Sequence, residues 1–257
     1  MVEIVNLSAA YGEALVLRDL SLSISAGQVL VVAGPNGSGK STLLKTLAGL
    51  LPVKNGVVSW NGTSLSDLPQ QRLAQTVAYL PQNRSVPEIT VLRLVLHGRF
   101  PYLSYPRRYR MKDLEIARTA LMQMGIADLA ERPLASLSGG QRQKAYIAMA
   151  LAQDTPVVLL DEPTTFLDVS HQLQLMDQAR LLAASGKAVV LVLHDLVLAL
   201  EYADRLAILD HGRLAAWGEP ETVFRQGCLD SVFGVVVRRF YINGRWHYYY
   251  ERGESVL

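Results

Sequence analysis

The sequence predicts an α/β fold, with a mostly parallel sheet, an N-terminal antiparallel β subdomain and an inserted α-helical subdomain. Short runs rich in Val and Leu, typical of strands buried on both faces, occur at Val29–Ala33, Val157–Leu160 and Val189–Leu193. Residues 1–24 alternate in places between apolar and polar side chains, which indicates antiparallel strands. From about residue 91 to 154 the apolar spacing becomes helical.

The composition restricts the class of protein. A chain of 257 residues suits one large domain or a core that carries a smaller inserted lobe. Half of the residues are hydrophobic and the formal net charge is +2, which indicates a globular protein and not a strongly basic nucleic-acid binder. We expect no secretory signal, and no apolar run approaches the roughly 20 residues that span a bilayer. The single Cys228 excludes an internal disulfide and fits a reducing cytoplasm.

A glycine-rich loop follows the first buried run. It matches the pattern G-x-x-x-x-G-K-[ST], in which backbone N–H groups and a helix N-terminus hold phosphates. We expect the Lys40 ammonium to contact the β- and γ-phosphates and the Ser41 hydroxyl to ligate Mg²⁺. An ordinary Gly-rich turn is the alternative, although a strand before the loop and a helix after it favour the phosphate site. The predicted phosphate contacts come from Gly34, Pro35, Asn36, Gly37, Ser38, Gly39, Lys40, Ser41 and Thr42.

The stretch after this loop predicts further β structure. Leu51-Pro52 and Asn55-Gly56 indicate turns, and Val57–Trp60 with Asn61-Gly62 indicates a hairpin. We expect another strand at Thr76–Leu80, ended by Pro81 and Gln82.

Two helix starts stand out in the helical stretch. Asp113 is placed to cap a helix that Gly125 ends. Ser138-Gly139-Gly140-Gln141 has the Ser-x-x-Gln spacing of a capping box. We expect a later helix around His171–Ala184.

Three predicted strands end at chemically active residues. They end at the phosphate loop, at Asp161 and Glu162, and at His194. Because ligands bind at the carboxyl ends of strands in open parallel sheets, these groups should converge in one crevice. Asp161 is placed to hold Mg²⁺, directly or through water, and Glu162 to act as the general base on an attacking water. A solvated strand end is the alternative for this carboxylate pair.

The motifs together resemble those of an ATP-binding cassette (ABC) ATPase over nearly the whole chain. The motifs in the typical order are Gly34–Thr42, Pro81-Gln82, Leu137-Ser138-Gly139-Gly140-Gln141, Leu159–Pro163, Leu167-Asp168 and His194. The resemblance implies a P-loop NTPase core that binds ATP and Mg²⁺. It further implies a nucleotide-binding core at residues 1–88 and 155–222 that includes the β subdomain, a helical subdomain at 89–154, and a C-terminal hairpin tail at 223–257.

The resemblance also implies roles for single residues. In this family Ser138, Gly139, Gly140 and Gln141 of one subunit face the γ-phosphate of ATP held by the other, in a homodimer. His194 matches the switch histidine that orients the water with Glu162. Gln82 matches the residue that senses Mg²⁺ and water, which places it at the predicted Mg²⁺ site with Ser41 and Asp161. Asp168 matches a loop that communicates across the dimer, although Thr165-Phe166-Leu167-Asp168 departs from the commoner Ser-Ala-Leu-Asp. Tyr11 matches the aromatic that stacks on adenine, with a core tyrosine as the alternative.

Two segments resemble the branch that imports ferric siderophores, haem and cobalamin, with siderophore import the nearest. They are His97–Tyr102 and Asp161–Gln172. This implies an ATPase at the cytoplasmic face of the inner membrane, bound to two transmembrane permease subunits. A periplasmic or extracellular substrate-binding protein would act through the permease, with no nucleic acid involved. A soluble ABC ATPase of iron–sulfur cluster assembly is one alternative. A DNA-repair or translation-associated ABC protein is another, which usually has two cassettes or a long coiled coil.

Two further segments have no assigned role. Tyr102–Lys112 holds Arg107, Arg108, Arg110 and Lys112 among tyrosines, and is either a solvated loop or a contact with the permease or anionic lipid. Val235–Tyr250 predicts a hairpin with a type I′ turn at Asn243-Gly244. We expect this hairpin to pack on the core or on a dimer partner.

Overall fold

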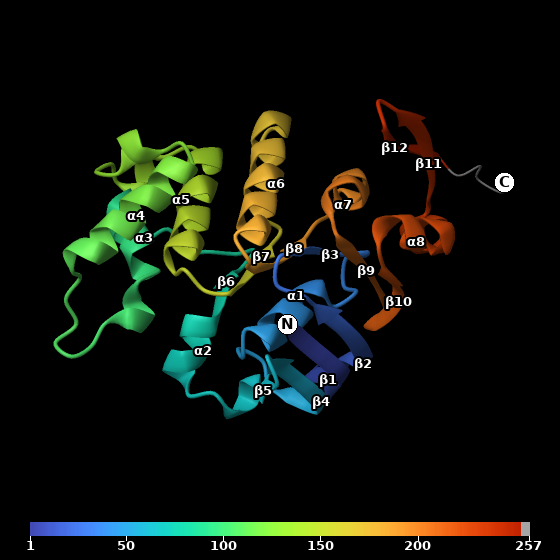
Figure 1. The fold of residues 1–257 in the computed structure, drawn as a ribbon, viewed down its shortest axis with the longest axis horizontal. Helices are drawn as coiled ribbons and strands as arrows, with labels where there is room; N and C mark the ends of the chain where they lie inside the picture. Colours follow the sequence, from blue (N-terminus) through green and yellow to red (C-terminus); the bar gives the residue numbers. More distant parts are fainter. Residues whose placement is uncertain (253–257) are drawn as a thin grey trace.

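A computed structural model describes residues 1–252 and places a six-stranded sheet at the centre of the molecule (Figure 1). Its neighbouring strands pair in parallel, except that β10 runs antiparallel to β9. The predicted mostly parallel sheet is therefore confirmed. In spatial order the strands are β10 (Arg213–Gly218), β9 (Arg205–Asp210), β3 (Val29–Ala33), β8 (Ala188–Val192), β7 (Val157–Asp161) and β6 (Val77–Leu80).

A second, four-stranded antiparallel sheet confirms the predicted β subdomain. Its spatial order is β2 (Ala14–Ile24), β1 (Val2–Tyr11), β4 (Val53–Trp60) and β5 (Thr63–Ser64). The turn predicted at Asn55-Gly56 is wrong, because both residues lie inside β4. Gly56 has φ 87°, and a Cβ there would lie 2.3 Å from the carbonyl oxygen of Asn6. The glycine therefore allows close approach within an irregular strand pair instead of ending the strand.

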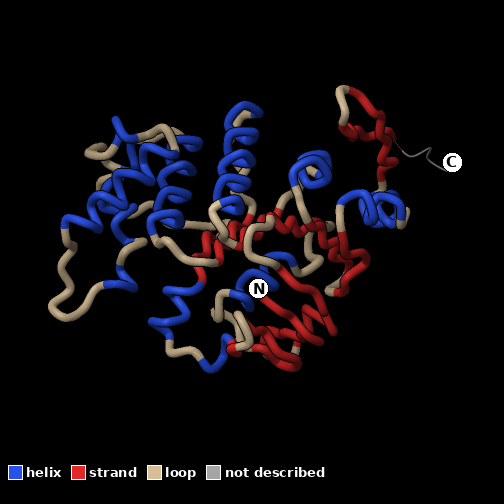
Figure 2. The backbone as a smooth tube through the Cα atoms, in the orientation of Figure 1, coloured by secondary structure: helices blue, strands red, loops and turns tan. Residues whose placement is uncertain are grey.

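Helices cover both faces of the parallel sheet, as Figure 2 shows. Alternate residues of β3 belong to different cores: Val29 and Val31 pack with the helices of one face, and Leu30 and Val32 pack with α1 and the antiparallel sheet. The covering helices and the short helix before β6 are α1 (Lys40–Leu47), α2 (Gln70–Thr76), α6 (Val169–Ala184) and α7 (Leu196–Tyr202). Because Thr76 ends α2, the strand predicted to begin there begins one residue later.

The helical subdomain forms one end of the molecule (Figure 1). Asp113 lies in the first turn of α4 and not at its N-cap position, which Arg110 holds. Its carboxylate still caps the helix start, because it accepts a hydrogen bond from the Arg110 N–H at 2.9 Å. The same carboxylate forms a buried ion pair at 3.2 Å with Arg99, from the segment after α3. The three main helices of the subdomain are α3 (Val91–His97), α4 (Met111–Gln123) and α5 (Gly139–Ala152).

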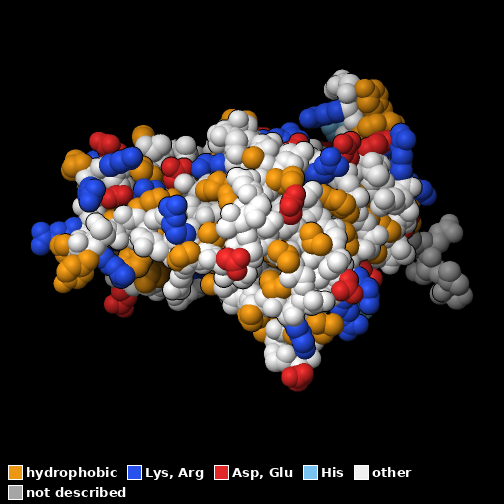
Figure 3. Space-filling view, turned by 60° about the horizontal axis from the view of Figure 1, so that its bottom comes forward, with side chains coloured by type: hydrophobic (Ala, Val, Ile, Leu, Met, Phe, Trp, Pro, Cys, Tyr) orange, Lys and Arg blue, Asp and Glu red, His pale blue; other side chains and the backbone are white. Residues whose placement is uncertain are grey.

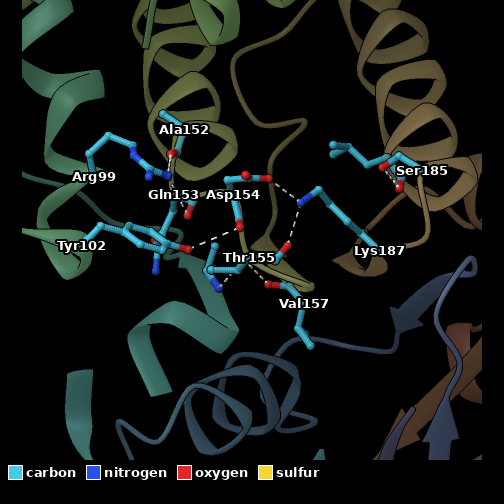
Figure 4. A network of polar contacts seen from close by, with 11 residues as sticks. Arg99, Tyr102, Ala152, Gln153, Asp154, Thr155, Val157, Ser185 and Lys187 are labelled. Atoms are coloured by element: carbon cyan, nitrogen blue, oxygen red, sulfur yellow. Dashed lines mark hydrogen bonds and ion pairs between the residues drawn. The ribbon is translucent and has the colours of Figure 1, made fainter. Parts of the chain in front are cut away.

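A network of polar contacts joins this subdomain to the core (Figure 4). Arg99 donates a hydrogen bond of 2.9 Å to the carbonyl of Ala152 at the end of α5, and the Tyr102 hydroxyl lies 3.3 Å from the carbonyl of Asp154. The Asp154 carboxylate accepts a 2.8 Å bond from Lys187, just before β8. These contacts fix the end of α5 against the sheet that carries the site.

The C-terminal part consists of two short helices and a hairpin. Asn243 and Gly244 both have positive φ, at 50° and 78°, which is the backbone of the predicted type I′ turn. The expected start of the tail at residue 223 falls inside α8. The elements are α8 (Pro220–Arg225), α9 (Cys228–Phe233), β11 (Val235–Ile242) and β12 (Arg245–Arg252).

Candidate nucleotide-binding and catalytic site

A cavity of about 670 Å³ lies at the carboxyl ends of the central parallel strands. It brings together the phosphate loop, which follows β3, Gln82 after β6, Glu162 after β7 and His194 after β8. The convergence expected from the sequence is therefore present in the fold. The lining residues are Val16, Asn36, Gly37, Gly39, Lys40, Ser41, Thr42, Gln82, Glu162 and His194.

The phosphate loop adopts a backbone conformation that requires glycine at two positions. At Gly34 a Cβ would lie 2.1 Å from the carbonyl oxygen of Leu209, and Gly39 has φ 102° where α1 begins. The buried Lys40 Nζ donates to the carbonyls of Gly34 and Pro35 at 2.8 and 2.9 Å. Burial lowers the pKa of Lys40, while the charges of the two acidic residues near it act in the opposite direction.

One polar atom of this loop supports a phosphate ligand. The Oγ atom of Ser38 is buried and has no hydrogen-bond partner among the described residues. A buried hydroxyl without a partner is costly, and a phosphate oxygen would satisfy it. The glycine backbone, the Lys40 ammonium and this hydroxyl therefore fit the phosphates of a nucleotide.

Of the three residues expected at the Mg²⁺ site, Ser41 and Asp161 lie side by side, while Gln82 contacts Glu162. Ser41 Oγ donates to Oδ1 of Asp161 at 3.1 Å, so a hydroxyl and a carboxylate face one another across the base of the loop. Tyr79 of β6 donates to the other carboxylate oxygen at 3.3 Å. Burial raises the pKa of Asp161, against the lowering effect of these two hydrogen bonds. This oxygen set matches the hard ligands that Mg²⁺ prefers.

Each oxygen of the Glu162 carboxylate is contacted by a different side chain. His194 Nε2 lies 2.6 Å from Oε1, and Gln82 Nε2 donates to Oε2. Glu162 itself has φ 50°, which is uncommon for a residue with a side chain and typical of strained functional positions. The three predicted catalytic residues therefore form one cluster, with Glu162 at its centre. In this arrangement Gln82 contacts Glu162, while the other two residues predicted for the Mg²⁺ site, Ser41 and Asp161, contact each other.

The predicted capping box at the start of α5 is present. Ser138 Oγ accepts from the Gln141 N–H at 3.3 Å, and Gln141 Oε1 accepts from the Ser138 N–H at 3.1 Å. In the described chain, none of the residues that line the cavity belongs to this motif. Gly139 and Gly140 lie instead against Phe166, in the loop that leads to α6. Within one chain the motif therefore lies outside its own phosphate site.

Asp168 caps α6. Its Oδ1 accepts a 2.9 Å bond from the His171 N–H and lies 2.8 Å from His171 Nδ1. The backbone hydrogen bond of His171 is the main cause of a lowered pKa at Asp168. The loop from Thr165 to Asp168 is thereby fixed beside the start of α5.

Tyr11 lies at the end of β1, half-exposed, with its hydroxyl 3.4 Å from Lys45 Nζ of α1. It stands beside the helix that carries the phosphate loop but is not among the residues that line the cavity. Its role in adenine stacking stays a prediction.

Sequence reasoning missed two residues of this region. Tyr79 bonds Asp161, and Val16 of β2 lines the cavity. The position of Tyr79 three residues before Gln82 on a strand next to β7 is the signal that could have found it. Val16 reaches the cavity only through the pairing of β1 and β2, which gives no local sequence signal.

The fold and this site are those of an ATP-binding cassette. The family model for the ABC transporter matches residues 17–165, more than half of the chain, and the chain belongs to this family. It is an ATP-binding protein with the ATP-hydrolysing activity of such cassettes. The predicted α/β P-loop NTPase fold is thereby confirmed.

Named relatives share about two fifths of their residues with this chain. The achromobactin transport ATP-binding protein CbrD of Dickeya dadantii (strain 3937) is 42% identical over 91% of this chain and 87% of the relative. The ferric enterobactin transport ATP-binding protein FepC of Escherichia coli (strain K12) is 39% identical over 90% and 86%. The hemin import ATP-binding protein HmuV of Streptomyces coelicolor (strain ATCC BAA-471 / A3(2) / M145) is 43% identical over 88% and 80%.

Solved structures agree with this assignment. A chain of an inward-facing ABC transporter, proposed to be of the metal-chelate type, superposes with a TM-score of 0.84 at 27% identity, over 100% of this chain and 99% of that one. The dimeric bacterial ABC transporter cassette MJ0796 gives 0.76 at 27% identity, over 86% and 99%. No helix within residues 1–252 is long and apolar enough to cross a membrane.

Proposed function

We propose that this chain is the ATP-hydrolysing subunit of an importer for iron–siderophore complexes. The observation that carries the enzymatic part is the cluster of Gln82, Glu162 and His194 at the mouth of the phosphate cavity. The iron cargo is supported by relatives named for achromobactin, ferric enterobactin and hemin. Haem or cobalamin is the alternative cargo.

The residues of the site divide the work of ATP binding and hydrolysis among them. The loop Gly34–Thr42 binds the phosphates, and Ser41 and Asp161 would hold Mg²⁺, which would place positive charge on the phosphate oxygens. Glu162 accepts the proton of the attacking water, and His194 and Gln82 hold its carboxylate in place. Lys40 adds a cation within the loop.

The position of Ser138–Gln141 outside the phosphate cavity of the same chain supports a dimer. We infer a homodimer in which this motif of one copy closes on the ATP of the other, in line with the dimeric cassette of the same fold. The N-terminus of α5 carries partial positive charge, which suits a γ-phosphate. Two permease subunits and a substrate-binding protein complete the importer, and the chain binds peripherally at the cytoplasmic face of the membrane.

The cargo is tested by growth. A strain that lacks this gene should fail on a ferric siderophore as sole iron source and should grow again when the wild-type gene is restored. The Lys40→Ala gene is the matched control and should not restore growth, because the loop loses its cation. Normal growth of the deletion strain on siderophores but not on haem or cobalamin would reassign the cargo. Co-purification with a cluster scaffold in place of a polytopic permease would contradict import.

A further inference from the structure

The C-terminal hairpin lies outside the cavity, yet one of its strands runs along the helix that follows the switch histidine. β12 packs beside α7, at the upper right of Figure 1. Val237 of β11 and Tyr248 of β12 are buried and belong to the main core. The hairpin is therefore an integral part of the domain rather than a free arm.

Two side chains of β12 make polar contacts with the two ends of α7. At the start of the helix, the Tyr250 hydroxyl donates to Oδ1 of Asp195 at 2.9 Å and accepts from the Val197 N–H at 2.8 Å. At the end of the helix, His247 Nδ1 lies 3.3 Å from Oε1 of Glu201. Burial raises the pKa of Tyr250 to about 12, so the phenol keeps its proton and donates throughout the neutral range.

The contact at the start of α7 is next to the catalytic cluster in the chain. Asp195 directly follows His194, and its carboxylate caps α7 by accepting from the N–H groups of Val197 and Leu198 at 2.8 and 3.1 Å. On the other side of His194, the Leu193 N–H donates to the carbonyl of Val32. The backbone on both sides of the histidine is therefore held by hydrogen bonds.

The His194 side chain has little other support. It is 49% exposed, so packing alone does not determine where its ring lies. Its 2.6 Å approach to Glu162 depends on the backbone turn between β8 and α7. A group that fixes this turn acts on the catalytic geometry without touching the nucleotide.

We propose that Tyr250 is a positioning residue for ATP hydrolysis: through Asp195 and the Val197 N–H it fixes the turn that presents His194 to Glu162. This inference rests on the proposed function only in that ATP hydrolysis is its readout. It gives the hairpin a task that its sequence pattern does not reveal. The substituted chain should still bind ATP normally, because Tyr250 does not line the phosphate cavity.

The test is the steady-state kinetics of Tyr250→Phe in the full chain. We expect kcat to fall about three- to tenfold, as for the loss of one hydrogen bond that supports the reactive geometry, with KM for ATP unchanged. The substitution removes one oxygen atom and leaves the ring in place, so Tm should fall by only a few degrees. An unchanged kcat would overturn the proposal.

Two control variants separate positioning from general support. Tyr249→Phe removes a hydroxyl that has no hydrogen bond to the described residues, from a residue that is 41% exposed, and should match wild type. His247→Leu removes the polar contact at the far end of α7 and should lower Tm without lowering kcat. If His247→Leu and Tyr250→Phe reduce kcat equally, the effect is general destabilisation and the proposal is wrong. A wild-type chain without ATPase activity would instead contradict the proposed function.

Discussion

The Nε2 atom of His194 lies 2.6 Å from Oε1 of Glu162, although the two residues are 32 positions apart in the sequence. The two residues follow β8 and β7, which pair in parallel with Asp161 opposite Val192. Because parallel neighbours end at the same edge of the sheet, each strand delivers its residue to the same place. With Gln82 on the second oxygen, the Glu162 carboxylate is held from both sides.

This geometry predicts the behaviour of Glu162→Gln. The amide cannot accept the proton of the attacking water, so ATP hydrolysis should fall by about 10²- to 10⁴-fold. ATP binding should persist, because the phosphate loop is unchanged, and ATP should hold the chain as a dimer. Turnover assays and size-exclusion chromatography with light scattering measure the two effects. Full hydrolysis by this variant would remove Glu162 from the role of base.

Tyr79→Phe should weaken the affinity of the site for Mg²⁺ rather than nucleotide binding itself. The phenol donates to Oδ2 of Asp161, and burial raises its pKa, so it stays a donor. Without that bond the carboxylate should hold its orientation less well, and the Mg²⁺ concentration that half-saturates ATP binding should rise about tenfold. A fluorescent ATP analogue titrated with Mg²⁺ measures this, and Tyr109→Phe on the helical subdomain is the control. An unchanged Mg²⁺ dependence would show that Tyr79 has no part in the metal site.

Asp161→Asn should stabilise the nucleotide-free chain at pH 7 while it abolishes Mg²⁺-dependent ATP binding. Burial raises the pKa of Asp161 above its unfolded value of 3.8, so its charged form is disfavoured in the fold. A group of this kind contributes most to stability below about pH 4, and the contribution is lost as pH rises through the folded pKa. The Asn variant carries no charge, so its Tm should exceed wild type by a few degrees at pH 7.

The stability difference between Asp161→Asn and wild type should depend on pH. The stability gain of Asp161→Asn should shrink as the pH falls toward 4, where the wild-type carboxyl takes up its proton. Asp128→Asn, at an exposed position, should show no such trend. Urea unfolding at pH 4 to 7 measures both variants. A less stable Asp161→Asn chain at pH 7 would contradict the argument.

The basic loop before α4 should act at a membrane or permease surface. Tyr105 is 96% exposed and Met111 72%, and Arg107 and Arg108 are exposed between them. Figure 3 shows Lys and Arg side chains beside hydrophobic ones at the end of the molecule where Figure 1 places this loop. The double substitution Arg107→Gln and Arg108→Gln should weaken membrane association about tenfold, with ATP binding unchanged.

The binding partner that the chain requires distinguishes a lipid surface from a permease surface. Binding to vesicles that contain anionic lipid, lost in the double variant, would indicate the lipid. Binding that needs the permease and is lost in the double variant would indicate the permease. Arg213→Gln, on β10, is the control and should behave as wild type. Unchanged association and transport in the double variant would leave the loop as a solvated segment.

Much of the fold was predictable because its signals are local. Three of these signals depend only on the residues of the segment itself. They specify the strand at Val29–Ala33, the phosphate loop after it, and the helix start at Ser138–Gln141. Asn243-Gly244 predicted its turn for the same reason. The error at Asn55-Gly56 has the opposite origin, since the position of Gly56 against Asn6 depends on the pairing of β4 with β1.

The sequence by itself determined the chemistry that the site offers: which residues are expected to bind phosphate, which carboxylates follow a buried strand, and the order of the motifs. Only the tertiary structure decided how these groups meet. It placed Gln82 and His194 on the two oxygens of Glu162, Tyr79 on Asp161 and Tyr250 on Asp195. These contacts join residues 32 to 82 positions apart, and such pairs are set by strand order and by packing across the sheet. No local pattern of side chains encodes them, because the chain between the partners must fold first.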